Sequence, residues 1–297
     1  MSTNESAPIT PLLNVSAESQ PQSEPVAVSD NDPDNPHWGV IQALLVWLVS
    51  AAMLLLVPLV LMIPYVFYYV FQHGSQEGLV QDPNLILISI IGVIPSHILT
   101  LFLVWFVVTR RGQLPLLKTL GWWWPKEFGP WKTIGFAVLL LIGGWILTYL
   151  VPGAETQIDH IVKSSYKARF VVAFLAAVTA PLVEEFVYRG VLYSAVRRAF
   201  GISPAIIGVT VLFAGVHILQ YYNNIGVIAV ITMLSFALTL VRAKTKSILP
   251  SYVIHLVFNG IQAIFLVTQP LLERLLKSRG AAATVEALVI HYPTIFI

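Results

Sequence analysis

Long apolar runs separated by short polar connections make up most of this chain of 297 residues. About 20 consecutive apolar residues are enough for a helix to cross a bilayer. The run at residues 200–241 is too long for one span, and the polar stretch at 220–224 predicts a turn between two helices there. The pattern predicts an all-α polytopic membrane protein, whose other charge-free spans cover residues 39–71, 85–108, 135–151 and 248–268.

The fourth span in chain order, residues 170–196, differs from the others because it carries charges at its centre. These charges are Glu184, Glu185 and Arg189. A charge in the middle of a bilayer costs about 2.5–3.5 kcal/mol on insertion scales, so three in one span need a reason. Glu185 and Arg189 are four residues apart on one helical face, which predicts that they pair. Glu184 lies about 100° round the helix and needs a partner from elsewhere in the chain.

The composition agrees with a membrane protein. Hydrophobic residues make up 57% of the chain and charged residues only 11%, whereas a soluble domain contains about 25% charged residues. The chain has no cysteine, which excludes disulfides, thiolate metal sites and a cysteine nucleophile. The net charge of +2 gives no reason to expect nucleic acid as a partner.

The chain divides into four parts by composition. Residues 1–37 are rich in Ser, Pro, Asn and Asp and contain no Lys or Arg, which predicts a disordered tail. Residues 38–150 hold the first three transmembrane helices, and residues 151–270 hold the charged span and the three spans after it. Residues 271–297 form a tail or a partial eighth helix. We therefore expect a bundle of seven or eight transmembrane helices.

Basic residues in the connections predict the orientation of the bundle. They cluster after the second, fourth and sixth spans, whereas the connections at residues 73–84 and 221–224 contain none. Because Lys and Arg are retained on the cytoplasmic side, we expect an integral protein of the bacterial inner membrane with a cytoplasmic N-terminus. The connection at residues 152–169 departs from this rule because three basic residues in it would face outward. A short amphipathic helix in that connection is one explanation.

Three histidines and an asparagine add polar groups to the spans. His97 has no acidic neighbour, and we expect it to hydrogen-bond across helices. His255 and Asn259 are four residues apart and share a helical face. At a rise of 1.5 Å per residue, Glu184, His217 and Asn259 lie about 16–21 Å from the basic ends of their spans. His255 lies about 10 Å from the basic end of its span. Glu184, His217 and Asn259 are thus predicted to lie at a similar depth in the membrane, where they can meet although they belong to separate helices.

Several interpretations fit such a cluster. A buried polar cluster can hold helices in register without any chemistry. A carboxylate beside an imidazole can instead polarise a water for attack on a carbonyl, and imidazole and carboxamide N–H groups can stabilise the oxyanion. Glu184, His217 and His255 would also supply a zinc site with an open position for water. The chain lacks His-Glu-x-x-His and Gly-x-Ser-x-Gly motifs, and it shows no internal repeat of the kind that favours a transporter.

The chain resembles the CPBP family of intramembrane proteases, which includes the CAAX prenyl endopeptidases and bacteriocin-processing proteins. The family pattern is Glu-Glu-x-x-x-Arg, then Phe-x-x-x-His, then His-x-x-x-Asn. The matching motifs here are Glu184-Glu185-x-x-x-Arg189, Phe213-x-x-x-His217 and His255-x-x-x-Asn259. An Ala-Pro-x-x lead-in precedes the first motif, and the resemblance covers residues 151–265.

This resemblance implies an intramembrane endopeptidase with a cytosol-facing active-site cavity inside the helical bundle. Glu184 and His217 would activate water, and His255 and Asn259 would stabilise the oxyanion. Two further residues would hold the motif helix in place: Glu185 and Arg189. The expected partners are the lipid bilayer and a lipidated peptide or membrane-protein substrate. No cofactor is required by the glutamate-dependent mechanism that we favour, and zinc is left open. The alternative is a non-catalytic scaffold or a bacteriocin-immunity-type protein that keeps the cluster for helix packing.

Overall fold

The structure is a computed structural model that describes residue 1 and residues 32–278. Within these residues every regular element is helical, and seven helices are long and apolar enough to cross a membrane. The prediction of an all-α polytopic bundle is confirmed. Of the expected tail or partial eighth helix at residues 271–297, residues 271–278 belong to the helix that begins at Leu249, and residues 279–297 lie outside the described residues, as does most of the expected N-terminal tail. The first helices are α1 (Val40–His73), η1 (Leu79–Gln81), α2 (Pro83–Ile91), α3 (Val93–Val108), α4 (Leu116–Leu120), α5 (Pro130–Leu150) and α6 (Gln157–Ser164).

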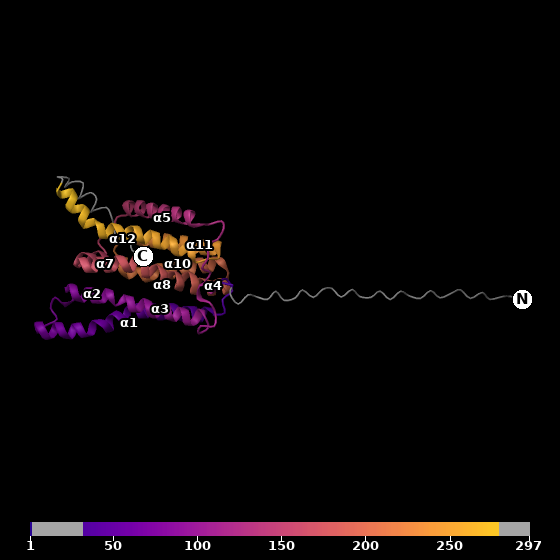
Figure 1. Cartoon of the computed structure of the whole chain (residues 1–297), viewed down its shortest axis with the longest axis horizontal. Helices are drawn as coiled ribbons and strands as arrows, with labels where there is room; N and C mark the ends of the chain where they lie inside the picture. The colour runs from indigo at the N-terminus through magenta and orange to yellow at the C-terminus, as the bar shows by residue number, and fades with distance from the viewer. Residues whose placement is uncertain (2–31, 279–297) are drawn as a thin grey trace.

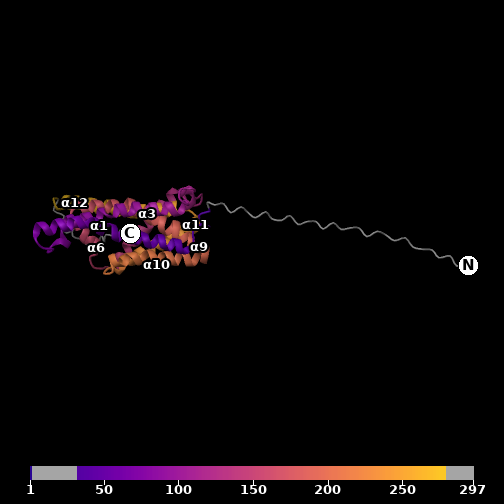
Figure 2. The same cartoon turned by 90° about the horizontal axis from the view of Figure 1, so that it is seen from below.

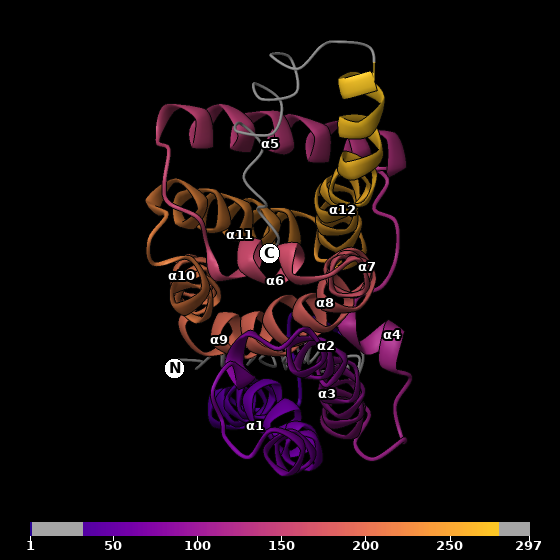
Figure 3. The same cartoon turned by 90° about the vertical axis from the view of Figure 1, so that its left-hand side faces the viewer.

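The charged span lies in the middle of the bundle. Figure 3 shows it between α1 and α3 on one side and α11 (Ile225–Thr245) and α12 (Leu249–Ser278) on the other, with α5 outermost. Helices α1 and α3 run side by side along the long axis of the bundle (Figures 1 and 2). The charged span therefore has protein neighbours on opposite sides, which allows its charged side chains to be shielded from lipid. Its segments are α7 (Tyr166–Phe174), η2 (Leu175–Thr179), α8 (Ala180–Glu184), η3 (Glu185–Leu192) and α9 (Tyr193–Phe200).

The second predicted span is divided into two helices, α2 and α3, at Gly92. A Cβ atom on Gly92 would lie 2.8 Å from the Cα atom of Pro58 in α1. Only glycine permits two helix backbones to approach so closely. The hydroxyl of Ser96, one turn further along α3, donates to the backbone oxygen of Met53 at 3.0 Å. The first two membrane spans are thus joined by a close backbone contact and an interhelical hydrogen bond.

The predicted turn after the fifth span is confirmed. Helix α10 (Ile202–Tyr221) ends there, and the side chain of Asn224 accepts from the Val227 N–H to cap α11. The connection before the charged span contains the amphipathic helix α6, which is capped by Thr156. Helix α12 continues to Ser278, ten residues past the predicted end of its span at Thr268, and includes Pro270. The last turns of that helix, nearly three in number, were not predicted because Pro270, Glu273 and Arg274 interrupt the apolar run.

The end of the N-terminal tail departs from the prediction of disorder. Pro33 and Asp34 are buried, and Asp34 forms ion pairs with Arg242 at 2.9 Å and with Arg197 at 3.0 Å. The Trp38 indole is also buried and donates to the Val191 carbonyl. A buried Arg needs a carboxylate partner, and the segment beginning at residue 32 supplies one. The ordered chain therefore begins before the first membrane helix.

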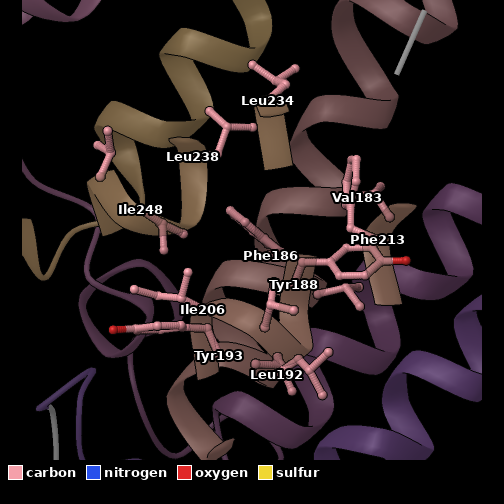
Figure 4. Packing of buried hydrophobic residues seen from close by; sticks show 14 of the residues in the cluster. Val183, Phe186, Tyr188, Leu192, Tyr193, Ile206, Phe213, Leu234, Leu238 and Ile248 are labelled. Carbon is pink, nitrogen blue, oxygen red and sulfur yellow. The ribbon is translucent and has the colours of Figure 1, made fainter. Parts of the chain in front are cut away.

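The main hydrophobic core surrounds the charged segment. Figure 4 shows Tyr188 of η3 beside Phe213 of α10, and Phe186 of η3 on the side of Leu238 and Leu234 of α11. The rings of Tyr188 and Phe213 meet at 4.9 Å between centroids and an interplanar angle of 70°. Edge-to-face pairs of this kind add about 0.5–1.5 kcal/mol to burial alone. This packing fixes the charged segment against α10 and α11.

Candidate active site

The two glutamates lie where the helix changes its hydrogen-bond pattern. Glu184 ends α8, and Glu185 begins the π-helical segment η3. A second π-helical segment, η2, precedes α8. Proline has no backbone N–H, so Pro181 in α8 cannot continue the ordinary ladder. Wider π turns in a helix are rare and are often found at functional sites.

Arg189 and Glu185 form the predicted ion pair, and both side chains are completely buried. The guanidinium Nη1 lies 3.0 Å from the carboxylate Oε1. Its other hydrogen bonds among the described residues go to α11: Nη2 donates to the Ser235 backbone and hydroxyl oxygens at 3.0 Å, and Nε donates to the Thr239 hydroxyl at 3.3 Å. The Phe213 ring lies 4.7 Å from the guanidinium carbon. A buried ion pair is tolerated when hydrogen bonds satisfy its donors in this way.

His255 lies between the two glutamates. Its Nδ1 lies 3.1 Å from the Glu185 Oε1, and its Nε2 lies 3.6 Å from the Glu184 Oε2. A carboxylate accepts, so Nδ1 carries the hydrogen that faces Glu185. The partner that Glu184 needed from elsewhere in the chain is therefore His255 of α12. Glu184 keeps 20% of its side chain exposed, whereas Glu185 and His255 are fully buried. Among these three side chains, Glu184 is thus the one with exposed surface.

His217 is held by its own helix. Its Nδ1 lies 2.8 Å from the Phe213 carbonyl, so Nδ1 donates and the neutral ring presents a lone pair at Nε2. The Phe213 ring contacts both His217 and His255, with centroid distances of 4.9 and 6.2 Å. Among the described residues, no hydrogen bond or ion pair joins His217 directly to Glu184. The two histidines are therefore neighbours across Phe213, and it is His255 that contacts the carboxylates.

Asn259 and His97 hold the start of the charged motif in place. Asn259, one turn beyond His255, is buried, and its Nδ2 donates to the Ala176 carbonyl of η2 at 3.0 Å. His97 of α3 hydrogen-bonds to the Thr179 hydroxyl at 2.9 Å. The expected interhelical hydrogen bond of His97 is confirmed. The segment η2 is thus fixed from two sides by side chains of other helices.

The proposed zinc ligands do not converge. Within the described residues, no three His, Asp or Glu side chains form a group able to hold a metal ion. The Nδ1 atoms of His217 and His255 both face protein oxygens, which leaves the Nε2 atom of each ring as the one that a metal would use. A zinc ion needs at least three protein ligands about 2 Å away. The donors as placed do not fit this requirement, so no step of a reaction is assigned to a metal below.

A cavity of about 350 Å³ lies elsewhere in the bundle, at the junction of α6, α7 and α12. Its lining includes Lys163, Arg169 and Glu273 and none of the predicted site residues. The cytosol-facing active-site cavity expected beside Glu184 thus stays a prediction.

Some residues of the site were not predicted. Ser235 and Thr239 complete the buried pair at Arg189, and their spacing of four residues in a charge-free span was the available signal. Trp47 of α1 donates to the Tyr188 hydroxyl at 3.0 Å, and no sequence pattern links these two residues. The Ala176 carbonyl is a backbone group, which a search for chemically active side chains does not find.

Comparison with known proteins identifies a related segment. Residues 166–261 match a family described as Rce1-like, type II CAAX prenyl endopeptidase Rce1-like. The matched segment contains all three motifs, and the match confirms the resemblance to the CPBP proteases that those motifs indicate. No curated protein matches this chain, and no solved structure matches it. The seven apolar helices and the matched segment together support an integral membrane protein related to a protease family.

Proposed function

Given the resemblance of residues 166–261 to the Rce1-like endopeptidases, we propose that this chain is an intramembrane endopeptidase. It would hydrolyse a peptide bond of a lipidated or otherwise membrane-associated substrate. The observation that carries the proposal is the contact of the partly exposed Glu184 carboxylate with His255, beside the buried Glu185–Arg189 pair. A carboxylate next to an imidazole is a suitable base for water. The family match does not favour the alternative of a scaffold.

The proposed reaction begins at Glu184. Its carboxylate takes a proton from a water molecule while the water oxygen attacks the substrate carbonyl carbon. The Nε2 lone pair of His217 accepts a hydrogen bond that keeps this water in line. The tetrahedral oxyanion would be stabilised by Asn259 and by His255, whose Nε2 donates when its ring carries both hydrogens. The proton on Glu184 then passes to the leaving nitrogen as the carbon–nitrogen bond breaks.

The environment of Glu185 supports a division of roles between the two adjacent glutamates. Glu185 is closed off from solvent and accepts from both Arg189 and His255. It would therefore orient His255 and would not itself bind water. Glu184 has the accessible side chain. The orientation of the bundle is also part of the proposal: the basic ends near Arg197 and Lys246, and the N-terminal segment bound there, would face the cytoplasm.

Cleavage by purified protein in liposomes tests this function. The probes are a farnesylated peptide with a C-terminal CaaX sequence, the same peptide without the lipid, and an unmodified transmembrane peptide. The parent protein is expected to cleave at least one probe, and Glu184→Gln and His217→Ala are expected to cleave it much more slowly. Glu155→Gln, which changes an exposed carboxylate in the connection before α6, is the matched control. Equal cleavage by the parent and both site variants would eliminate the mechanism.

A parallel treatment with a zinc chelator separates the two mechanisms. Retained cleavage after chelation, with less than one zinc per protein by elemental analysis, is expected for the glutamate-dependent reaction. Loss of activity that zinc restores would show that a metal is required and that the side chains rearrange to bind it.

A further inference from the structure

The lead-in to the glutamate motif contains an unusual backbone arrangement. The Ala180 N–H donates to the Leu175 carbonyl, five residues earlier, as expected of a π turn. The next donor in this pattern would be the N–H of residue 181, reaching back to the Ala176 carbonyl. Residue 181 is proline and has no N–H. The Ala176 carbonyl is therefore left without a donor from its own helix.

Asn259 of α12 supplies the missing donor. Its Nδ2 lies 3.0 Å from the Ala176 oxygen, and both residues are buried. A buried carbonyl without a donor loses its hydrogen bond to water and gains none in return, so the contact with Asn259 is strongly favoured. It also fixes the amide orientation. A carbonyl oxygen only accepts, and the carboxamide must therefore turn its nitrogen toward Ala176 and its oxygen away.

We propose that Pro181 is a positioning residue for Asn259. By withholding a backbone N–H, it reserves the Ala176 carbonyl for one hydrogen of the Asn259 amide. With that hydrogen engaged, the plane of the whole carboxamide is fixed, and a preorganised orientation is what a group that stabilises an oxyanion requires. This inference rests on the proposed function for its catalytic consequence. The positioning itself is a structural statement that can be tested without activity.

The first experiment restores or withholds the N–H at position 181. Pro181→Ala introduces a donor that can reach Ala176, which frees the Asn259 amide to rotate. Replacement of Pro181 by lactic acid gives the same methyl side chain with an ester oxygen where alanine has its N–H. We expect kcat for the cleaved probe to fall about 10- to 100-fold in Pro181→Ala, with KM unchanged. The lactic acid variant is expected to stay close to the parent. Pro64→Ala, which removes a proline from α1 in the same way, controls for general effects on a membrane helix.

A double-mutant comparison shows whether Pro181 acts through Asn259. If it does, Pro181→Ala lowers kcat in the parent but has no further effect in an Asn259→Ala background. If the factors by which the two substitutions lower kcat multiply in the double variant, Pro181 and Asn259 act independently and the proposal is overturned. An equal loss in the alanine and lactic acid variants would also overturn it, because the N–H would then be irrelevant.

Experimental structures of the parent protein and of Pro181→Ala test the positioning of Asn259 without any substrate. The proposal predicts a hydrogen bond from Asn259 to Ala176 in the parent and its loss in the variant. Absence of that contact from the parent overturns the proposal even if the variants fail to fold. Presence of the contact in a protein that cleaves no probe would refute the proposed function and leave the positioning supported.

Discussion

The Nε2 atom of His255 lies 3.6 Å from the Oε2 atom of Glu184, and this contact joins the last described helix to the charged span. The same ring reaches Glu185 through its other nitrogen. The imidazole of His255 therefore contacts both the partly exposed carboxylate of Glu184 and the buried Glu185–Arg189 ion pair. The arrangement separates the two adjacent glutamates by environment, since they face the same histidine from sites of different accessibility.

Glu184→Gln is expected to abolish catalysis without weakening the fold. Its Oε2 atom is buried and accepts no hydrogen bond in the described structure, so an amide there removes little that stabilises the protein. Loss of a general base typically costs about 10²–10⁴ in rate. Cleavage in liposomes and thermal unfolding in detergent measure the two effects on one preparation. A parental cleavage rate in this variant would exclude Glu184 as the base. A biological function lost at unchanged stability would exclude the scaffold alternative.

The two histidines are expected to respond differently to alanine. His255→Ala removes the hydrogen bond to Glu185, a buried carboxylate, and should lower the free energy of unfolding by about 1–3 kcal/mol as well as the cleavage rate. Among the described residues, the hydrogen bond of His217 goes to the carbonyl of Phe213 in its own helix, so His217→Ala should lower the rate with a smaller loss of stability. Unfolding in mixed micelles gives the comparison. The reverse order of stabilities would contradict the hydrogen-bond assignments.

Much of this fold follows directly from the sequence. The charge-free runs gave the membrane helices, and the spacing of Glu185 and Arg189 gave their pairing. Depth along each helix predicted that Glu184 and His217 share a level, but it placed His255 about two turns away. That estimate failed to anticipate the contact between His255 and Glu184, because counting residues from a helix end contains no information about tilt or about which way a side chain extends.

Contacts between distant parts of the chain were the least predictable. Asp34 is one of several acidic residues in a polar stretch, and nothing in that stretch shows that it binds Arg242 more than 200 residues later. Arg242 itself was counted as a basic residue of a connection, although it is completely buried. The effect of Pro181 on Ala176 also needs the π turn, which is decided by packing. Local sequence patterns therefore predict the helices and the side-chain pairs within one helix. The partners that come from distant segments are decided by tertiary packing.

The buried pair should show strong coupling. Glu185→Ala leaves the Arg189 guanidinium buried without its carboxylate, and Arg189→Ala leaves the Glu185 carboxylate buried without its guanidinium. Each substitution is therefore expected to lower the free energy of unfolding by about 3–5 kcal/mol. The double variant loses both charges together and should be clearly more stable than the sum of the single effects predicts. Unfolding free energies of all four proteins in one detergent give the coupling energy. Additive losses would mean that the two side chains do not compensate each other.

The N-terminal segment is expected to stabilise the end of the bundle without taking part in catalysis. Asp34 binds Arg242 of α11 and Arg197 of α9, and Arg242 is fully buried. Asp34→Ala leaves that guanidinium without its carboxylate, which should cost about 3–5 kcal/mol. Asp32→Ala is the matched comparison, because Asp32 is exposed in the same segment and its carboxylate accepts from the Asp34 N–H at 3.0 Å without pairing with Arg242. Loss of that hydrogen bond should cost about 0.5–1.5 kcal/mol, clearly less than the loss of the buried ion pair.

Unfolding free energy and cleavage rate together test this role of Asp34. The rate per folded molecule of Asp34→Ala should equal that of the parent, since Asp34 contacts none of the proposed catalytic residues among its described ion pairs and hydrogen bonds. Trypsin should cut the variant faster at Arg197 and Arg198, which the segment holds through the backbone oxygens of Asp34 and Pro36. Identical stability and trypsin sensitivity in Asp34→Ala and Asp32→Ala would show that the buried ion pairs do not anchor this end of the bundle.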